Sequence, residues 1–351
     1  MDFIEQSLAT NTTIFLIAAA VVWFAGTKLS RYVDIYADRT GLGQAFAGAL
    51  ILGVATSLPE LATTLTAAYS GAAKLAGSNL LGGVVMQTAV LALIDALVLR
   101  GKPLTLFSPR SSLLMLGVML IGLTAMASAA ISSGELFSIA GVGAWPVLLF
   151  LAYLSSLWVI YRYEGQPRWK PTGEIAQPPE SARDLKDAYH EKYADVSLKA
   201  IVGLFAVASL AVLAGGFFVA RTSEAIAEQT GIGQNFIGAT LLALATSLPE
   251  VSTTYSAVRF GAYSMAAANI VGTNSLEIAL FLPADIAYRA GAIVDALDPS
   301  TGFLASLGII ATSLYLWGIL ERRDKTVLGM GVDSFCVLVV YGVGLGIYYT
   351  L

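Results

Sequence analysis

Long apolar runs separated by short polar clusters make up most of the chain between residues 13 and 349. A helix needs about 20 consecutive apolar residues to cross the hydrocarbon core of a membrane. Runs of this length recur, and none shows the short alternating segments typical of a membrane β-barrel. We therefore predict an all-α polytopic membrane protein. The ten expected transmembrane helices are residues 13–29, 43–70, 79–99, 111–130, 137–161, 199–220, 233–258, 264–289, 302–320 and 328–349.

A polar stretch over residues 161–198 separates five expected spans from the other five. Because five is odd, the second half should enter the membrane upside down relative to the first. The predicted organisation is a first five-helix repeat over residues 1–161, a loop over 162–198, and a second, inverted five-helix repeat over 199–351. We expect the loop to be a solvated, partly helical linker, and nothing in its sequence supports regulation.

The basic residues indicate the orientation in the membrane. In this arrangement 17 lysines and arginines lie on the side of the central loop, and three, Lys74, Arg221 and Arg289, lie on the other side. Basic residues collect on the cytoplasmic side of membrane proteins. We therefore predict a cytoplasmic central loop and both termini outside. The compact chain and short loop favour a prokaryotic cytoplasmic membrane.

Composition agrees with a membrane protein and excludes several kinds of site. The chain is 56% hydrophobic and 13% charged, with a mean hydropathy of +0.73, whereas soluble domains carry about 25% charged residues. The only cysteine, Cys336, rules out an intrachain disulfide. The only histidine, His190, lies in the central loop. Histidine-based metal sites and Ser-His-Asp catalysis are therefore excluded from the expected spans.

The hexapeptide Ala-Thr-Ser-Leu-Pro-Glu occurs twice, over residues 55–60 and 245–250. From residue 41 to residue 60, 13 of 20 positions equal the residue 190 further on. Chance does not produce this identity, so the chain is two copies of one membrane unit. The same offset pairs other polar and small residues: Asp34 with Glu224, Asp38 with Glu228, Asn79 with Asn269, Gly82 with Gly272, and Asp95 with Asp285.

Each hexapeptide places a proline and a glutamate in the middle of an expected span. Pro59 and Pro249 lack the N–H that a helix needs, so we expect carbonyls over residues 53–55 and 243–245 to lose their helical partners. A cation can satisfy such carbonyls at membrane depth. Hydroxyls and carboxylates add further oxygen ligands: Thr56, Ser57 and Glu60 in the first copy, and Thr246, Ser247 and Glu250 in the second. Oxygen ligands of these kinds suit Ca²⁺ or Na⁺.

The segment that follows each motif adds a third carboxylate. Glu277 lies in an apolar span, and its counterpart at the 190-residue offset is Gln87. Burying one carboxylate near the bilayer midplane costs at least about 2.5–3.5 kcal/mol, and three in one cavity also repel each other. A carrier that can switch conformation only when cations or protons offset this charge is an obligate exchanger. Inverted repeats can supply the mechanical part of the exchange.

These residues resemble the calcium/cation antiporter superfamily, specifically its sodium/calcium exchanger branch, over nearly the whole chain. The Thr-Ser-Leu-Pro-Glu sequence on kinked second and seventh helices carries the resemblance. The resemblance implies Ca²⁺ export in exchange for Na⁺, with Glu60 and Glu250 as central Ca²⁺ ligands. It further implies roles at flanking Na⁺ sites or in completing the cavity for Thr56, Ser57, Thr246, Ser247, Thr273, Glu277 and Gln87.

The chain departs from the family pattern in both copies after the shared asparagine. Family members commonly have Gly-Ser-Asn there, followed by Asn or Asp, whereas the first copy has Gly82-Gly83-Val84 and ends in Gln87. The second copy ends in Glu277, one methylene longer than Asp. Without a hydroxyl at position 83, one flanking Na⁺ site loses a ligand. Exchange against protons, or of Mg²⁺ or Mn²⁺, is therefore the alternative.

Other interpretations stay open for several residues. Gln87 can instead form an interhelical hydrogen bond without binding an ion, and Glu277 can be a structural or protonated acid. Asp95 and Asp285 can guide ions to the cavity. A channel or an intramembrane enzyme fits less well than a carrier. The expected partners are inorganic cations and the lipid bilayer; we expect no nucleic acid, no cofactor and no enzymatic activity, and a monomer suffices for transport.

Overall fold

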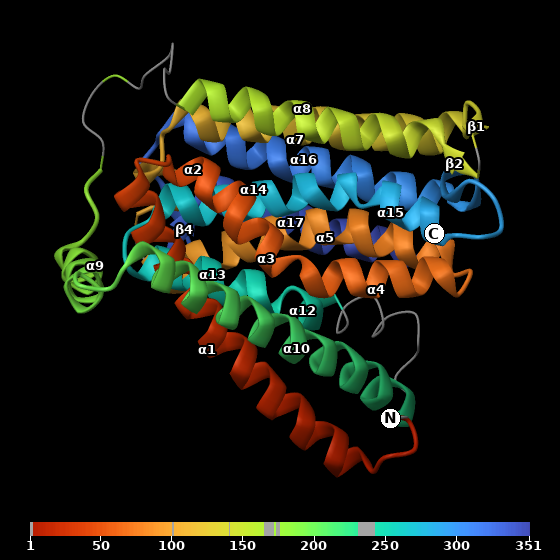
Figure 1. Cartoon of the computed structure of the whole chain (residues 1–351). Coiled ribbons are helices and arrows are strands. Elements are labelled where there is room, and N and C mark those ends of the chain that lie inside the picture. The colour runs from red at the N-terminus through yellow and green to blue at the C-terminus, as the bar shows by residue number, and fades with distance from the viewer. Residues whose placement is uncertain (1–2, 100–101, 140, 165–171, 173–175, 231–242) are drawn as a thin grey trace.

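The computed structural model describes residues 3–99, 102–139, 141–164, 172, 176–230 and 243–351, and it is mostly helical (Figure 1). The first copy contains α1 (Leu8–Thr40), α2 (Gln44–Phe46), the π-helix η1 (Ala47–Leu52), α3 (Gly53–Thr56), α4 (Leu58–Tyr69), α5 (Ala73–Ile94), the π-helix η2 (Asp95–Leu99), α6 (Leu104–Phe107), α7 (Ser111–Ser133), β1 (Ser138–Ile139), β2 (Val142–Gly143) and α8 (Ala144–Glu164).

Helix α9 (Glu180–Lys192) lies in the central loop. The second copy contains α10 (Leu198–Thr230), α12 (Ala243–Thr246), α13 (Leu248–Arg259), α14 (Tyr263–Ala279), α15 (Phe281–Ala287), the 3-10 helix η4 (Ile293–Ala296), α16 (Pro299–Glu321), β3 (Thr326–Val327), β4 (Met330–Gly331) and α17 (Val332–Tyr348).

Seven continuous helical stretches of the described residues are long and apolar enough to cross a membrane, and the bent pair 44–56 and 58–69 makes an eighth. The chain is therefore an integral membrane protein. The C-terminal α17 has 17 residues, and part of the predicted span 233–258 lies outside the described residues. The count of ten spans in two inverted repeats stays a prediction.

Two of the predicted spans begin later than expected. Strands β1 and β2 pair antiparallel, as do β3 and β4, and α8 and α17 start directly after the second strand of each pair. Gly141 and Gly329 adopt positive φ angles of 82° and 83°, which the tight turns require and which glycine tolerates best. Because these hairpins contain apolar residues, the hydropathy pattern did not distinguish them from the helices that follow.

The duplicated acids Asp95 and Asp285 hold these hairpins in place across the two copies. Asp285 accepts hydrogen bonds from the backbone N–H groups of Gly143 in β2 and of Ile293, each at 2.7 Å. Asp95 accepts the equivalent bonds from Gly331 in β4 at 2.9 Å and Leu104 at 2.8 Å. Both acids are buried, so each copy fixes the hairpin of the other, and the ion-guiding alternative finds no support.

Each long first helix of a copy packs along the other. Helices α1 and α10 have 33 residues each, run in opposite directions, and lean away from the remaining helices toward the N-terminus (Figure 1). Helix α1 begins at the N-cap Ser7, whose hydroxyl accepts from the Thr10 N–H at 3.1 Å, and ends at Gly41 with φ 71°. The opposed directions agree with inverted copies.

Helix α14 crosses η1, just before the first hexapeptide, at very close range. A Cβ atom on Gly48 of η1 would lie 2.6 Å from the Met265 carbonyl oxygen, and a Cβ on Gly272 would overlap the Ala49 backbone. The missing side chains let two backbones touch, as small residues do between membrane helices. This contact brings the middle of α14 against the first copy of the hexapeptide.

Candidate functional site

Both motif glutamates lie in the first turn of a new helix. The chain bends by 50° between residues 44–56 and 58–69, and α4 starts with Pro59 in its first turn, where a proline is tolerated. In the second copy Pro249 starts α13 in the same way. Glu60 and Glu250 follow these prolines and are 3% and 0% exposed. The sequence thus breaks a membrane helix to place a carboxylate at a helix N-terminus, where its charge is favoured.

The four motif hydroxyls are buried beside these carboxylates. Thr56, Ser57, Thr246 and Ser247 are each at most 2% exposed. Thr56 Oγ1 donates to the Gly53 carbonyl at 3.1 Å, and Ser57 Oγ donates to it at 2.9 Å. The Gly53 carbonyl also accepts the Ser57 N–H at 3.0 Å. The expectation that this carbonyl loses its partners is therefore wrong, and its donors keep hydroxyl lone pairs available to a cation.

The third carboxylate meets its own repeat counterpart. Gln87 on α5 donates from Nε2 to Oε1 of Glu277 on α14 at 2.6 Å, and both side chains are buried. Thr273 lies one turn before Glu277 and is also buried; a Cβ on Gly53 would lie 3.2 Å from its Oγ1. Residues 190 apart thus face each other at the centre of the molecule, and Thr273 reaches the first motif from the second copy.

Several buried oxygens of this cluster accept no hydrogen bond of normal geometry from the part of the chain that the structure describes. Neither carboxylate oxygen of Glu60 or Glu250, nor Oε2 of Glu277, accepts a hydrogen bond of normal geometry from the described residues. The three carboxylates nevertheless lie within electrostatic range of one another. An unpaired buried charge is strongly unfavourable. The Gln87 Oε1 and Thr273 Oγ1 atoms are also unpartnered among the described residues, so the cluster presents oxygen atoms that a cation would satisfy.

Two asparagines on α14 belong to this environment and had not been selected from the sequence. Asn274 donates to the Val84 carbonyl at 3.1 Å and to Thr88 at 3.2 Å, which ties α14 to α5. Asn269 donates to Thr253 and Thr254 at 3.1 and 3.3 Å. Their Oδ1 atoms have no partner within the described part of the chain. The duplication of Asn79 and Asn269 was a usable signal, whereas Asn274 has Val84 as its counterpart.

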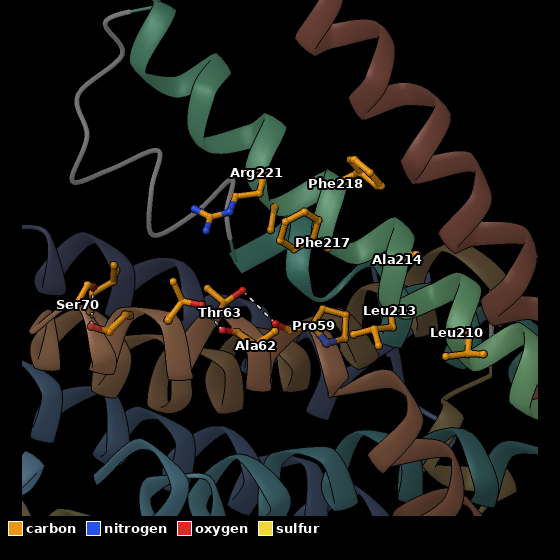
Figure 2. Close-up of a pocket in the computed structure, with 14 residues that line it drawn as sticks. Pro59, Ala62, Thr63, Ser70, Leu210, Leu213, Ala214, Phe217, Phe218 and Arg221 are labelled. Carbon is orange, nitrogen blue, oxygen red and sulfur yellow. Dashed lines mark hydrogen bonds between the residues drawn. The ribbon is translucent and has the colours of Figure 1, made fainter. Parts of the chain in front are cut away.

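A cavity of about 700 Å³ between α4 and α10 reaches the first motif. We call it the α4/α10 groove; Figure 2 shows Pro59, Ala62 and Thr63 on α4, with Ser70 directly after this helix, across from Leu213, Phe217 and Arg221 on α10. Pro59 immediately precedes Glu60. The groove therefore runs from the end of α4 to the residue next to a site carboxylate.

The family model for the sodium/calcium exchanger protein matches residues 10–162 and 200–350. The chain belongs to the sodium/calcium exchanger family. It is 24% identical to the inner membrane protein YrbG of Escherichia coli strain K12 over 325 residues, 92% of each chain. It is 33% identical to the sodium/calcium exchanger MaX1 of Methanosarcina acetivorans over 138 residues, 37% of this chain and 38% of the relative.

The fold is that of a solved exchanger. The sodium-calcium exchanger NCX_Mj superposes with a TM-score of 0.71 at 17% identity, over 97% of this chain and 99% of the other. The expected family and the transport of cations by a membrane antiporter are therefore confirmed. Family membership does not decide which cations this chain exchanges, nor does it assign the nine predicted site residues.

Proposed function

We propose that the protein is a secondary active antiporter that exports Ca²⁺ in exchange for Na⁺, by alternating access to the buried carboxylates. The observation that carries the proposal is the cluster of Glu60, Glu250 and Glu277, which is fully buried and leaves five carboxylate oxygens unpartnered among the described residues. Such a site is too negative to be stable when empty, so only cation loading permits the switch between conformations.

The roles we propose follow the positions of the side chains. Glu60 and Glu250 bind the Ca²⁺, and Thr56, Ser57, Thr246 and Ser247 contribute to flanking Na⁺ positions. Thr273, Glu277 and Gln87 complete the cavity. The Gln87 amide already bonds Glu277 at 2.6 Å, which leaves its own carbonyl oxygen as the atom that can face an ion.

The proposed organisation is two inverted five-helix repeats, residues 1–161 and 199–351, joined by the loop 162–198. The opposed directions of α1 and α10 support it (Figure 1). The excess of basic residues on the loop side supports a cytoplasmic loop and outer termini.

Flux measurements in liposomes test the proposal. Purified protein in Na⁺-loaded vesicles should take up ⁴⁵Ca²⁺ when the outside is low in Na⁺, and Glu250→Gln should abolish uptake. Thr63→Ala, on the face of α4 that lines the groove, is the matched control and should transport. Uptake driven only by a proton gradient would make H⁺ the coupling ion in place of Na⁺. The observation that favours this alternative is Gly83, because the missing hydroxyl there removes a ligand of one flanking Na⁺ site. Flux of Mg²⁺ or Mn²⁺ without flux of Ca²⁺ would identify one of these ions as the substrate in place of Ca²⁺.

A further inference from the structure

Gly83 on α5 lies directly against the third carboxylate. A Cβ atom at this position would lie 2.5 Å from Oε1, 2.7 Å from Oε2 and 2.8 Å from Cδ of Glu277. Contacts this short do not occur in proteins, so any side chain at position 83 must displace the Glu277 carboxylate. Its neighbour Gly82 differs, because a Cβ there would meet only Leu304 at 3.9 Å.

We propose that Gly83 determines the shape and ion preference of the site by making room for Glu277, an inference that rests on the proposed function. The absent side chain gives the longer glutamate a place to extend toward α5, where Gln87 fixes it at 2.6 Å. Gly83 and Glu277 are thus a matched pair. Position 83 contributes no ligand; it positions one.

The contact between Gly83 and Glu277 explains with one cause why the chain departs from the family pattern at both of these positions. A serine at position 83 and an aspartate at position 277 would fill the same volume from opposite sides, with a hydroxyl on α5 and a shorter acid on α14. Gly83 with Glu277 moves the oxygen ligands onto a single flexible side chain. Serine at position 83 without a change at position 277 should cause a clash, and aspartate at position 277 without a change at position 83 should leave a gap.

A double-mutant cycle tests the pairing, with ⁴⁵Ca²⁺ binding to the purified protein in detergent as the readout. Gly83→Ser and Glu277→Asp should each weaken Ca²⁺ binding about tenfold, whereas the double variant should return to within about threefold of the wild type, because contacting residues are not additive. Gly83→Ala should weaken binding like Gly83→Ser. Gly82→Ala is the matched control and should bind as the wild type.

Thermal unfolding of the same variants in cation-free buffer separates the two proposals. A wild type that binds no Ca²⁺ would overturn the proposed substrate, but the unfolding temperatures would still show whether the double variant recovers what each single variant loses. Additive losses in unfolding, or a Gly83→Ala variant identical to the wild type, would overturn the pairing.

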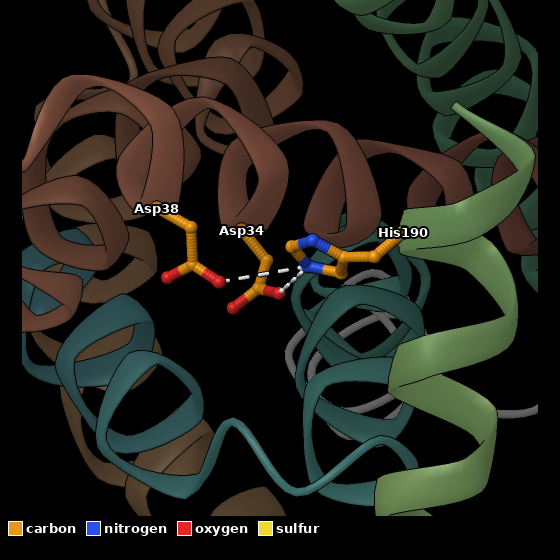
Figure 3. Close-up of side chains that lie close together, drawn as sticks. All are labelled: Asp34, Asp38 and His190. Carbon is orange, nitrogen blue, oxygen red and sulfur yellow. Dashed lines mark hydrogen bonds and ion pairs between the residues drawn. The ribbon is translucent and has the colours of Figure 1, made fainter. Parts of the chain in front are cut away.

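A second, independent observation concerns the loop helix α9. Asp34 of α1 is fully buried and accepts hydrogen bonds from Tyr189 and, at 3.3 Å, from Lys186, both on α9, with His190 Nε2 at 3.0 Å. Figure 3 shows Asp34 and Asp38 on α1 facing His190 on α9. The loop helix is therefore docked on a buried charge, which differs from the solvated linker expected from the sequence.

The cluster has metal-binding side chains, but the chain supplies its own cation. Asp34, Asp38 and His190 offer ligand atoms that all lie within 4.8 Å of one another. The Lys186 ammonium lies 3.2 Å from Asp34 and 3.1 Å from Asp38. Burial lowers the pKa of Lys186, but the two carboxylates outweigh it and the pKa ends above its ordinary value. The lysine stays charged, and its ammonium contacts both carboxylates of the cluster.

The docked segment also touches the second copy. The Tyr189 ring packs on Phe260, at the end of α13, with centroids 5.1 Å apart. Beyond α9, the carbonyls of Tyr193 and Val196 accept from Arg39 of α1 at 2.5 and 2.6 Å. We infer that α9 is a latch that holds α1 against α13, so that this end of the molecule opens only when α9 releases.

Thiol accessibility in detergent tests the latch without reference to the transported ion. In a Cys336→Ala background, Ser256→Cys reports the α1/α13 contact, because Ser256 of α13 is buried and its hydroxyl donates to the Thr27 carbonyl of α1 at 3.1 Å. Adding Lys186→Ala and Tyr189→Phe should raise its rate of modification about tenfold, because a buried thiol reacts only when exposed. Lys192→Ala, on the same helix, is the matched control. Hydrogen exchange over residues 180–192 shows whether α9 has detached; detachment with an unchanged thiol rate, or no detachment, would overturn the latch.

Discussion

Helix α1 packs closely against α13, whereas its counterpart α10 leaves a cavity of about 700 Å³ against α4. The two pairs of helices correspond at the 190-residue offset, so equivalent residues can be compared directly. Between α1 and α13 lies a smaller pocket of about 370 Å³, lined in part by Tyr189 and Lys192 of α9. Two equivalent helix pairs thus adopt different arrangements in a single molecule.

One pair of equivalent positions shows the difference most clearly. Ser256 of α13 donates to the Thr27 carbonyl of α1 at 3.1 Å. The counterparts, Thr66 and Phe217, both line the α4/α10 groove, and Thr66 donates instead to the Ala62 carbonyl of its own helix at 2.8 Å. A hydrogen bond between helices in the α1/α13 pair is replaced by a bond within one helix in the α10/α4 pair.

Glycines mark where each long helix can approach the motif. A Cβ on Gly26 of α1 would overlap Ser252 of α13, and a Cβ on its counterpart Gly216 would lie 2.5 Å from Cγ of Pro59. Helix α10 therefore touches α4 at the proline, and the groove opens beyond it. In our account, exchanging the two arrangements between the copies moves access to the carboxylates from one side of the membrane to the other.

The largest expected effect is a difference in thiol reactivity. In a Cys336→Ala background, Thr66→Cys should react with a soluble maleimide about 100-fold faster than Ser256→Cys, because thiol reactivity follows exposure. Thr66 is exposed and Ser256 is 4% exposed. Stopped-flow labelling in detergent measures both rates. Equal rates would mean that the α4/α10 and α1/α13 helix pairs are equally open in solution.

The hydrogen bonds from Asp95 and Asp285 to the hairpins are equivalent in the two copies, and their loss is the next largest expected effect. Asp95→Asn and Asp285→Asn should each destabilise the fold by about 1.5–3 kcal/mol, because each removes charge-assisted hydrogen bonds to buried N–H groups. Thermal unfolding in detergent measures the loss. The two losses should be similar in size. A large loss at only one aspartate would show that the hairpin contacts are not equivalent.

A smaller effect is expected at the close contact of α1. Gly26→Ala should disfavour the packed α1/α13 arrangement by about 1–3 kcal/mol through overpacking. The Ser256→Cys thiol should then react faster. Gly203→Ala on α10 is the control, since a Cβ there meets nothing within 4 Å. An unchanged thiol rate would show that Ser252 yields without moving the helix.

The smallest effect is expected at an aromatic contact that only one of the two equivalent helix pairs has. The rings of Trp23 and Tyr255 lie 5.2 Å apart across α1 and α13, and the equivalent positions of the α10/α4 pair are Leu213 and Leu65. Trp23→Leu should weaken the contact by about 0.5–1.5 kcal/mol and raise Ser256→Cys labelling a fewfold. The reciprocal Leu213→Trp should slow labelling of Thr66→Cys. Opposite signs would contradict the comparison.

The sequence was informative about the site because the motif is duplicated. The repeat selects Glu60 and Glu250 without any structure, and the apolar surroundings of Glu277 make it the third acid. The structure buries all three and brings them within electrostatic range. Their ion-binding roles remain proposals.

Other features could not be predicted from the same pattern. The strand pairs β1–β2 and β3–β4 contain apolar residues and adjoin helices, so hydropathy extends the predicted spans through them. The docking of α9 depends on Asp34, whose partner Lys186 is distant in sequence. The different packing of α4 and α13 involves positions outside the identical hexapeptides, such as Thr66 and Ser256, and the sequence pattern does not show which helix each of these positions contacts.

The central claim is that the carboxylates are reached from one side at a time, as in a carrier and unlike a pore. The most direct test is efflux of ⁴⁵Ca²⁺ from loaded proteoliposomes, with and without unlabelled Ca²⁺ outside. The account predicts that external Ca²⁺ accelerates efflux and that efflux nearly stops without an external cation. Efflux at the same rate in both conditions, abolished by Glu250→Gln, would identify a channel and contradict it.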